Sequence, residues 1–131
     1  LGLVGSEMCI RDRYLPALSR AEKIQKKAAM ANFDWKQPED IFDKLAEETE
    51  ELLVAIANND KLNTEEEIGD ILFTLVNLTR HFDLEPEDIM RKSNLKFENR
   101  FRAMEDYAKD NNLALDTMNL EELEEIWQKI K

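Results

Sequence analysis

Apolar residues recur at spacings of three and four along most of the chain, and signals that start helices recur with them. Pro16, Pro38 and Pro86 can each occupy the first turn of a helix, and Asn119 with Glu122 forms a capping pair for a last one. No segment alternates between polar and apolar residues for long, so no sheet is expected. We therefore predict five helices, at residues 16–31, 38–58, 64–81, 86–109 and 120–131.

These helices predict an all-α fold. The 131 residues suffice for one domain with a core but not for two. A hydrophobic content of 43%, with three glycines and three prolines, is typical of a helix-rich globular protein. We expect a bundle of four main helices, with the helix at 120–131 as an additional C-terminal arm.

The helix at 38–58 places acidic residues at the border of its apolar stripe. At about 100° per residue, the four apolar positions of the stripe fall within about 60° of one another. Glu48 lies just beside them, Glu51 lies further round, and Glu47 lies further still. The pattern is E-E-x-x-E, with a carboxylate next to the predicted core. The apolar positions are Ile41, Leu45, Leu52 and Ile56.

The helix at 64–81 carries one narrow polar strip between apolar flanks. Glu67 and Asp70 begin the strip as an E-x-x-D motif, one turn apart, and Thr74, Asn77 and His81 continue it. Between Asp70 and Asn77 the strip has only short polar groups, which indicates the lining of a groove rather than a solvated surface. Ile68, Leu72, Leu75, Val76 and Phe82 make one apolar face of this helix.

Two cations interrupt the apolar stripe of the helix at 86–109. Lys96 and Arg100 lie one turn apart, next to Phe97, Phe101 and Met104. They could bind an anion, pair with glutamates of the helix at 38–58 as structural bridges, or extend out of the core.

Several other polar residues have simpler interpretations. Glu50 and Glu65 read as ordinary solvated helix charges. Thr64 with Glu67 could form a capping box and nothing more. We expect a structural role for His81, the single histidine, and a packing role for Trp35.

Four or five converging carboxylates without histidine or cysteine favour a hard divalent cation, Mg²⁺ or Mn²⁺. A di-iron site of the Glu-x-x-His type is disfavoured because Leu78 stands three residues before His81. Magnesium held by a few carboxylates keeps positions for water and substrate phosphates, for which Lys96 and Arg100 would be partners. Metal-assisted hydrolysis of a polyphosphate is the natural reaction, and there is no glycine-rich loop of the P-loop type.

The charge balance excludes some partners. Acidic residues outnumber basic ones 29 to 18, for a net charge of -11. Binding to nucleic acid or to an anionic membrane needs clustered lysines and arginines, so neither is expected. No apolar run approaches the length of a membrane span.

The first thirteen residues, LGLVGSEMCIRDR, fit neither a helix nor a strand and make a poor signal peptide. They resemble translated sequencing adapter at the end of a metagenomic gene fragment, so we expect residues 1–13 to be non-native. The single cysteine, Cys9, lies among them. The remaining chain has no cysteine, which is compatible with the cytoplasm.

The chain resembles the MazG-type all-α nucleoside triphosphate pyrophosphohydrolases. E-E-x-x-E at 47–51 and E-x-x-D at 67–70 match the signature of that family. The match extends from residue 15 to residue 131 through LPALSRAEKIQKKAA, FDW, DKLAEE, EEEIGDILFTLVNLTRH, NLKFENRFR and LEELEEIWQKIK. Residues 14–131 are thus expected to be the C-terminal catalytic domain from a 5′-truncated gene, because the family carries two such domains in tandem.

The resemblance implies hydrolysis of NTPs and dNTPs to the monophosphate and pyrophosphate by a cytoplasmic homodimer that controls nucleotide pools. It implies that Glu48, Glu51, Glu67 and Asp70 are catalytic and bind Mg²⁺, with Glu47 in support. It also implies that the triphosphate is contacted by Lys96, Arg100, Trp127 and Lys131, the last two lying one turn apart on the final helix.

Two alternatives remain open. The chain could be a non-catalytic MazG-like module for dimerisation or nucleotide sensing, although every expected metal position is filled. It could also be an acidic helical interaction protein, in which case removing Glu48 or Asp70 would relieve repulsion without loss of function.

Overall fold

The computed structural model describes residues 14–131, and over these residues it contains five α-helices and one short 3-10 helix, with no strand. The predicted all-α fold is therefore confirmed. The stretch at 1–13 that we expect to be non-native, with Cys9, lies outside the described residues. Among the described helices, none combines the length and the apolar character that crossing a membrane requires.

The helices begin close to the predicted residues. Pro38 and Pro86 are the first residues of α3 and α5, as expected. Asn119 and Glu122 form the predicted capping box at the start of α6, with hydrogen bonds of 2.9 and 3.4 Å. The bounds are α2 Ala17–Met30, α3 Pro38–Ala57, α4 Lys61–His81, α5 Pro86–Asp110, η2 Leu115–Thr117 and α6 Leu120–Lys129.

The start of α4 corrects one interpretation. Asp60 caps this helix, because its Oδ1 accepts a hydrogen bond from the Asn63 N–H at 3.1 Å. Thr64 lies inside the first turn and donates its hydroxyl to the Asp60 carbonyl at 2.7 Å. The helix therefore begins three residues earlier than predicted, and Thr64 with Glu67 is not a capping box.

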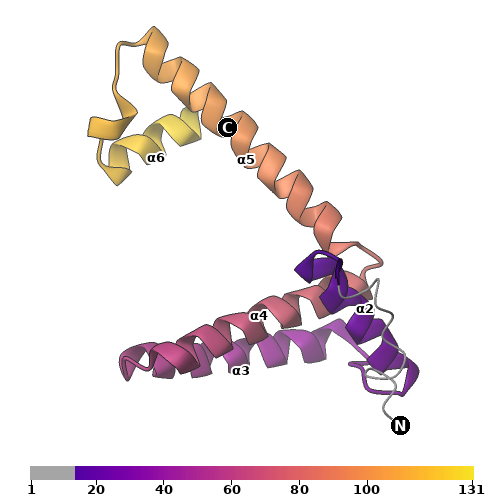
Figure 1. Ribbon diagram of the computed structural model, residues 1–131. Coiled ribbons are helices and arrows are strands. Elements are labelled where there is room, and N and C mark those ends of the chain that lie inside the picture. The colour runs from indigo at the N-terminus through magenta and orange to yellow at the C-terminus, as the bar shows by residue number, and fades with distance from the viewer. Residues whose placement is uncertain (1–13) are drawn as a thin grey trace. The chain divides into compact units, whose positions relative to one another are not determined.

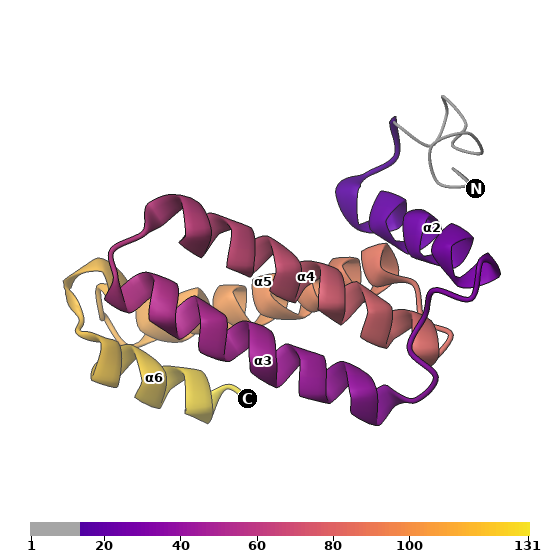
Figure 2. The same ribbon diagram turned by 90° about the horizontal axis from the view of Figure 1, so that it is seen from below.

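The chain divides into two compact units, one ending at Asp88 and the other formed by Ile89–Lys131. In the first unit, α3 and α4 run antiparallel side by side after a short connection, and α2 packs against α4 (Figures 1 and 2). The predicted association of four helices would join α5 to these three, and it stays a prediction.

The first unit has a small apolar core that includes Ile41, Ala55 and Val76, all nearly inaccessible to solvent. Four of the five residues on the apolar face of α4, Ile68, Leu72, Leu75 and Phe82, are 39 to 57% exposed, whereas Val76 is buried. Ile56, which belongs to the predicted apolar stripe of α3, is exposed. The polar strip of α4 is turned inward instead, with Glu67 and Thr74 buried.

The second unit is held together by the packing of α6 on α5. Met104, Ala108 and Ile126 are buried in it. The ring of Trp127 lies beside the Phe97 ring, with 5.4 Å between their centroids. Burying these side chains is the main stabilisation available to a helix as short as α6.

Candidate metal centre

Three carboxylates converge where α3 faces α4. Glu48 of α3 and Glu67 and Asp70 of α4 each offer an oxygen, and these atoms lie within 4.8 Å of one another. Glu48 and Glu67 are buried, at 5% and 8% exposure, whereas Asp70 is exposed. The spacing of three residues places Glu67 and Asp70 on one side of α4. Helix pairing then brings Glu48 to them from the other side.

The negative charge of this cluster is incompletely balanced. Among the residues that the structure describes, Oε2 of Glu48 and Oε2 of Glu67 are buried without a hydrogen-bond partner. Burial, a hydrogen bond with Glu48 and the charge of Glu51 raise the pKa of Glu67 to about 7. Buried carboxylates in such proximity require protons or cations to compensate them.

One cation reaches the cluster from within its own helix. Lys44 Nζ lies 3.1 Å from Oε1 of Glu48 and 3.6 Å from Oε1 of Glu47. The hydrogen bond with Glu48 is the largest cause of a raised pKa of Lys44. A single ammonium group compensates part of the charge and leaves the second oxygen of Glu48 free for another cation.

The donor set fits a hard divalent metal ion. Every available ligand atom in the cluster is a carboxylate oxygen, and two carboxylate oxygens are buried without a hydrogen-bond partner in the described part of the chain. Glu48, Glu67 and Asp70 could therefore hold a metal ion between α3 and α4.

The other two predicted acidic ligands differ in position. Glu51 lies close enough for its charge to contribute to the raised pKa of Glu67. Glu47 is outside the group of three, and its side chain is largely exposed beside Lys44. Glu47 thus has the position of a peripheral residue.

The predicted cationic residues belong to the second unit, and the acids to the first. Arg100 stacks its guanidinium over the Trp127 ring, 3.9 Å from the centroid, and Nη2 donates to the Trp127 carbonyl at 3.2 Å. Lys96 is exposed. Lys131 is exposed and lies beyond the end of α6 at Lys129, so its expected place on the last helix is wrong.

A cavity of about 510 Å³ in the first unit adjoins the acidic cluster. Asp70, Thr74 and Asn77 line it, which confirms that this part of the polar strip borders a groove. Glu48 and Lys44 line it as well. The other lining residues come from α2, from the segment between α2 and α3, and from α4: Ile24, Gln25, Ala28, Asn32, Phe33, Asp34, Trp35, Phe73 and Arg80.

A polar network around Arg80 escaped the sequence analysis. Arg80 Nη1 donates to Oδ2 of Asp34 at 3.1 Å, and Nη2 donates to Oδ1 of Asp34 and to Oδ1 of Asn77. Gln25, buried on α2, donates to the Phe73 carbonyl at 2.9 Å. The sequence offered one sign, a glutamine at an inward position of α2. It indicates that α2 makes a polar contact but does not identify the residue that α2 contacts.

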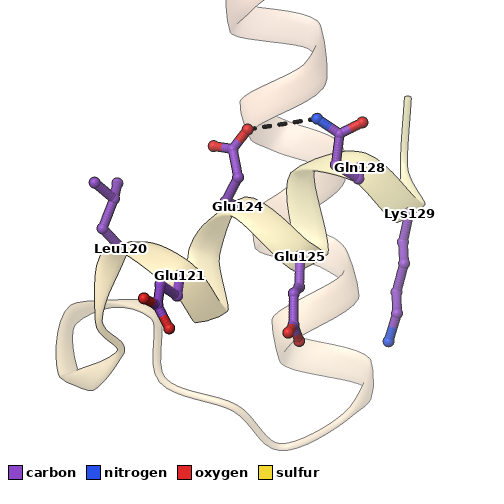
Figure 3. Close-up of a pocket in the computed structure, with 6 residues that line it drawn as sticks. All are labelled: Leu120, Glu121, Glu124, Glu125, Gln128 and Lys129. Carbon is purple, nitrogen blue, oxygen red and sulfur yellow. Dashed lines mark hydrogen bonds between the residues drawn. The ribbon is translucent and has the colours of Figure 1, made fainter.

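A second hollow lies on the surface of α6 (Figure 3). Its six lining side chains all come from this helix, and Gln128 Nε2 donates to Oε1 of Glu124 at 3.4 Å. Within residues 14–131, no groups from another element line it, so we assign no site there. The lining residues are Leu120, Glu121, Glu124, Glu125, Gln128 and Lys129.

Comparison with known proteins places this arrangement in a family. The model of the MazG nucleotide pyrophosphohydrolase domain matches residues 36–104, just over half of the chain. The chain is 43% identical over 117 residues to the nucleoside triphosphate pyrophosphohydrolase/pyrophosphatase MazG of Thermotoga maritima, which covers 89% of this chain and 45% of that protein. It is 43% identical over 121 residues to the nucleoside triphosphate pyrophosphohydrolase of Escherichia coli K12, which covers 91% of this chain and 46% of that protein.

A third relative, the uncharacterized protein YabN of Bacillus subtilis, is 42% identical over 69 residues, covering 53% of this chain and 14% of that protein. The chain spans about half the length of the first two relatives. The resemblance noted in the sequence is confirmed: the chain belongs to the MazG nucleotide pyrophosphohydrolase family.

Proposed function

We propose that the chain hydrolyses nucleoside triphosphates and deoxynucleoside triphosphates to the monophosphate and pyrophosphate in the presence of Mg²⁺. The observation that carries the proposal is the convergence of Glu48, Glu67 and Asp70 beside a cavity. Two of their oxygens are buried and lack a hydrogen-bond partner among residues 14–131. The names of the Thermotoga and Escherichia relatives support the same reaction class.

In this proposal Glu48, Glu51, Glu67 and Asp70 hold the metal, and Glu47 supports them from the rim. An all-oxygen set suits Mg²⁺, with Mn²⁺ as a substitute. The bound ion would supply charge neutralisation at the phosphates and a water of lowered pKa. The carboxylates would fix the position of the bound ion, since two of them are buried on a pair of packed helices.

The other predicted site residues lie in the second unit. Lys96, Arg100, Trp127 and Lys131 are proposed to contact the triphosphate. Arg100 is held by the Trp127 ring and carbonyl, which limits its motion and leaves part of its guanidinium for phosphate oxygens. Oriented donors of this kind stabilise charge that develops on a phosphate.

Three further proposals concern the whole protein. Residues 14–131 form one catalytic domain, which acts in the cytoplasm in the removal of excess or aberrant nucleotides. The domain forms a homodimer. Ile68, Leu72 and Leu75 of α4 are exposed apolar side chains. They support dimerisation because contact with a second copy would remove them from water.

Product analysis tests the proposed reaction. The purified chain is incubated with Mg²⁺ and each common NTP and dNTP, and the products are identified by phosphorus NMR. One pyrophosphate released for each monophosphate supports the proposal. Release of single phosphate would show a different reaction class, and folded protein that binds Mg²⁺ and nucleotide without turnover would favour a nucleotide-sensing module.

A further inference from the structure

The two oxygens of the Glu48 carboxylate have different surroundings. Oε1 lies 3.1 Å from the ammonium group of Lys44, whereas Oε2 is buried without a hydrogen-bond partner within residues 14–131. The Glu48 side chain is almost inaccessible to solvent, so water does not readily take the place of either neighbour. One oxygen of this carboxylate is therefore occupied by a cation, and the other remains for a metal ion.

The contact between Lys44 and Glu48 is closer than a comparable pair elsewhere in the first unit. Lys26 follows Glu22 by four residues on α2, the order that stabilises a helix more than the reverse order. Lys44 instead precedes Glu48 by four residues, and yet its contact is shorter, at 3.1 Å against 3.7 Å. The Lys44 side chain is also less exposed than that of Lys26, at 34% against 60%. Helix pairing alone does not account for this difference.

The surroundings of the acidic cluster keep the Lys44 ammonium in place. Lys44 lines the cavity beside Glu48 and Asp70, so its charge faces the side from which a metal ion would enter. Glu47 lies 3.6 Å from Nζ and holds the ammonium from the solvent side. Because Lys44 and Glu48 lie one turn apart on α3, the ammonium stays within reach of Oε1 when a metal ion binds at Oε2.

Occupation of Oε1 has different consequences for different divalent ions. Ca²⁺ takes about six to eight oxygen ligands and readily binds both oxygens of one carboxylate. Mg²⁺ is smaller, requires nearly octahedral geometry, and completes its shell with water and phosphate oxygens. A carboxylate that gives one oxygen to an ammonium group has only the other for the metal. Lys44 thus removes a ligand atom that Ca²⁺ would use and that Mg²⁺ does not need.

We propose that Lys44 is a positioning residue that sets the metal selectivity of the acidic cluster. By holding Oε1, it limits Glu48 to one ligand oxygen and favours Mg²⁺ over Ca²⁺. The inference rests on the proposed function, since it concerns the metal ion of the same site. Lys44 acts here through Glu48 and touches neither the ion nor the reacting phosphate.

Direct metal binding tests this inference. The full chain, freed of metal with a chelator and dialysed, is titrated calorimetrically with MgCl₂ and with CaCl₂. Lys44→Met keeps the length of the side chain and removes the ammonium group. Loss of the positive charge should strengthen binding of both ions, but the gain for Ca²⁺ should exceed the gain for Mg²⁺ about tenfold, because only Ca²⁺ gains a ligand atom.

Two further variants serve as controls. Lys44→Arg retains a cationic donor for Oε1 and should keep the selectivity close to that of the wild type. Lys26→Met makes the same chemical change in an ion pair on α2 that does not line the cavity, and it should alter neither affinity.

NMR of the lysine ammonium groups tests the wild type directly and covers the case in which Lys44→Met fails to fold. The Lys44 signal is assigned by its absence from the spectrum of Lys44→Arg. It should persist when the protein is saturated with Mg²⁺, because the ammonium stays on Oε1.

Four results would overturn the inference: equal gains for the two ions in Lys44→Met, a weakening of both, loss of the Lys44 signal on binding of Mg²⁺, or a wild type that binds neither ion. Failure of the proposed function looks different. In that case the wild type releases no pyrophosphate from any NTP, while the titrations still show Lys44-dependent selectivity between Mg²⁺ and Ca²⁺.

Discussion

Glu48 of α3 and Glu67 of α4 face each other across the helix pair as buried carboxylates, each with one oxygen that lacks a hydrogen-bond partner among the described residues. Two like charges in a poorly solvated interface repel each other. Lys44 forms an ion pair with Glu48, at 3.1 Å, which compensates one of these two charges. The metal-free fold thus carries an unfavourable electrostatic interaction that protons or a divalent cation would relieve.

Removing one of these charges should stabilise the metal-free protein. Glu67→Gln keeps the shape of the side chain and removes the repulsion with Glu48 and Glu51. At pH 8 in the presence of a chelator we expect its Tm to exceed that of the wild type by a few degrees. Glu65→Gln, at an exposed position of the same helix, should leave Tm unchanged. A lower Tm for Glu67→Gln would show that the Glu67 carboxylate makes contacts that stabilise the metal-free fold.

The stability of the metal-free protein should also fall as the pH rises. The pKa of Glu67 is raised from 4.5 to about 7, so the folded state binds this proton more tightly than the unfolded state. Its stabilising contribution is complete below pH 4.5 and is lost as the pH rises through about 7. Scanning calorimetry between pH 5 and pH 8 should show a steeper decline for the wild type than for Glu67→Gln. Parallel declines would contradict the assigned shift.

Divalent metal should reverse this loss. At pH 8 we expect Mg²⁺ or Mn²⁺ to raise Tm in a concentration-dependent way. The free energy of unfolding should increase by about 2.7 kcal/mol when the metal concentration is a hundredfold above Kd. Glu48→Gln and Asp70→Asn should abolish the effect. An undiminished rise of Tm in both variants would place the metal elsewhere.

Trp127 should contribute to both stability and substrate affinity. Its ring packs against Phe97 and supports Arg100, so Trp127→Ala should lower the free energy of unfolding by about 2 kcal/mol and raise KM. Trp127→Phe keeps an aromatic surface for Arg100 and should lose less of both. Denaturant unfolding and steady-state kinetics measure the two effects. Equal losses in the two variants would argue against a role for the ring in holding Arg100.

Local signals account for the parts of the fold that were predictable. Pro38, Pro86 and the Asn119–Glu122 pair act within one helical turn, so the sequence alone locates these helix starts. The closeness of Glu67 and Asp70 is equally local. Their meeting with Glu48 was predictable because both acidic motifs lie near the apolar border of adjacent helices.

The rotation of α4 was not predictable in the same way. Periodicity shows that Ile68 and Leu72 share a face, but it cannot tell which face meets α3. The structure turns Glu67 and Thr74 inward. Burying these polar groups has an unfavourable desolvation free energy, which is expected of a binding site and not of an apolar packing surface. The Asp34–Arg80 pair was missed for a related reason, because its residues are 46 positions apart and belong to no common periodic pattern.

The rate of pyrophosphate release by Glu48→Gln, measured beside Glu50→Gln, tests the central claim most directly. Both substitutions remove one carboxylate from α3, but Glu50 is exposed and outside the cluster. The acidic cluster predicts a loss of about a hundredfold or more in kcat/KM for Glu48→Gln and a value within about twofold of the wild type for Glu50→Gln. Equal activity of the two variants would contradict the assignment of the acidic cluster as the metal centre that drives hydrolysis.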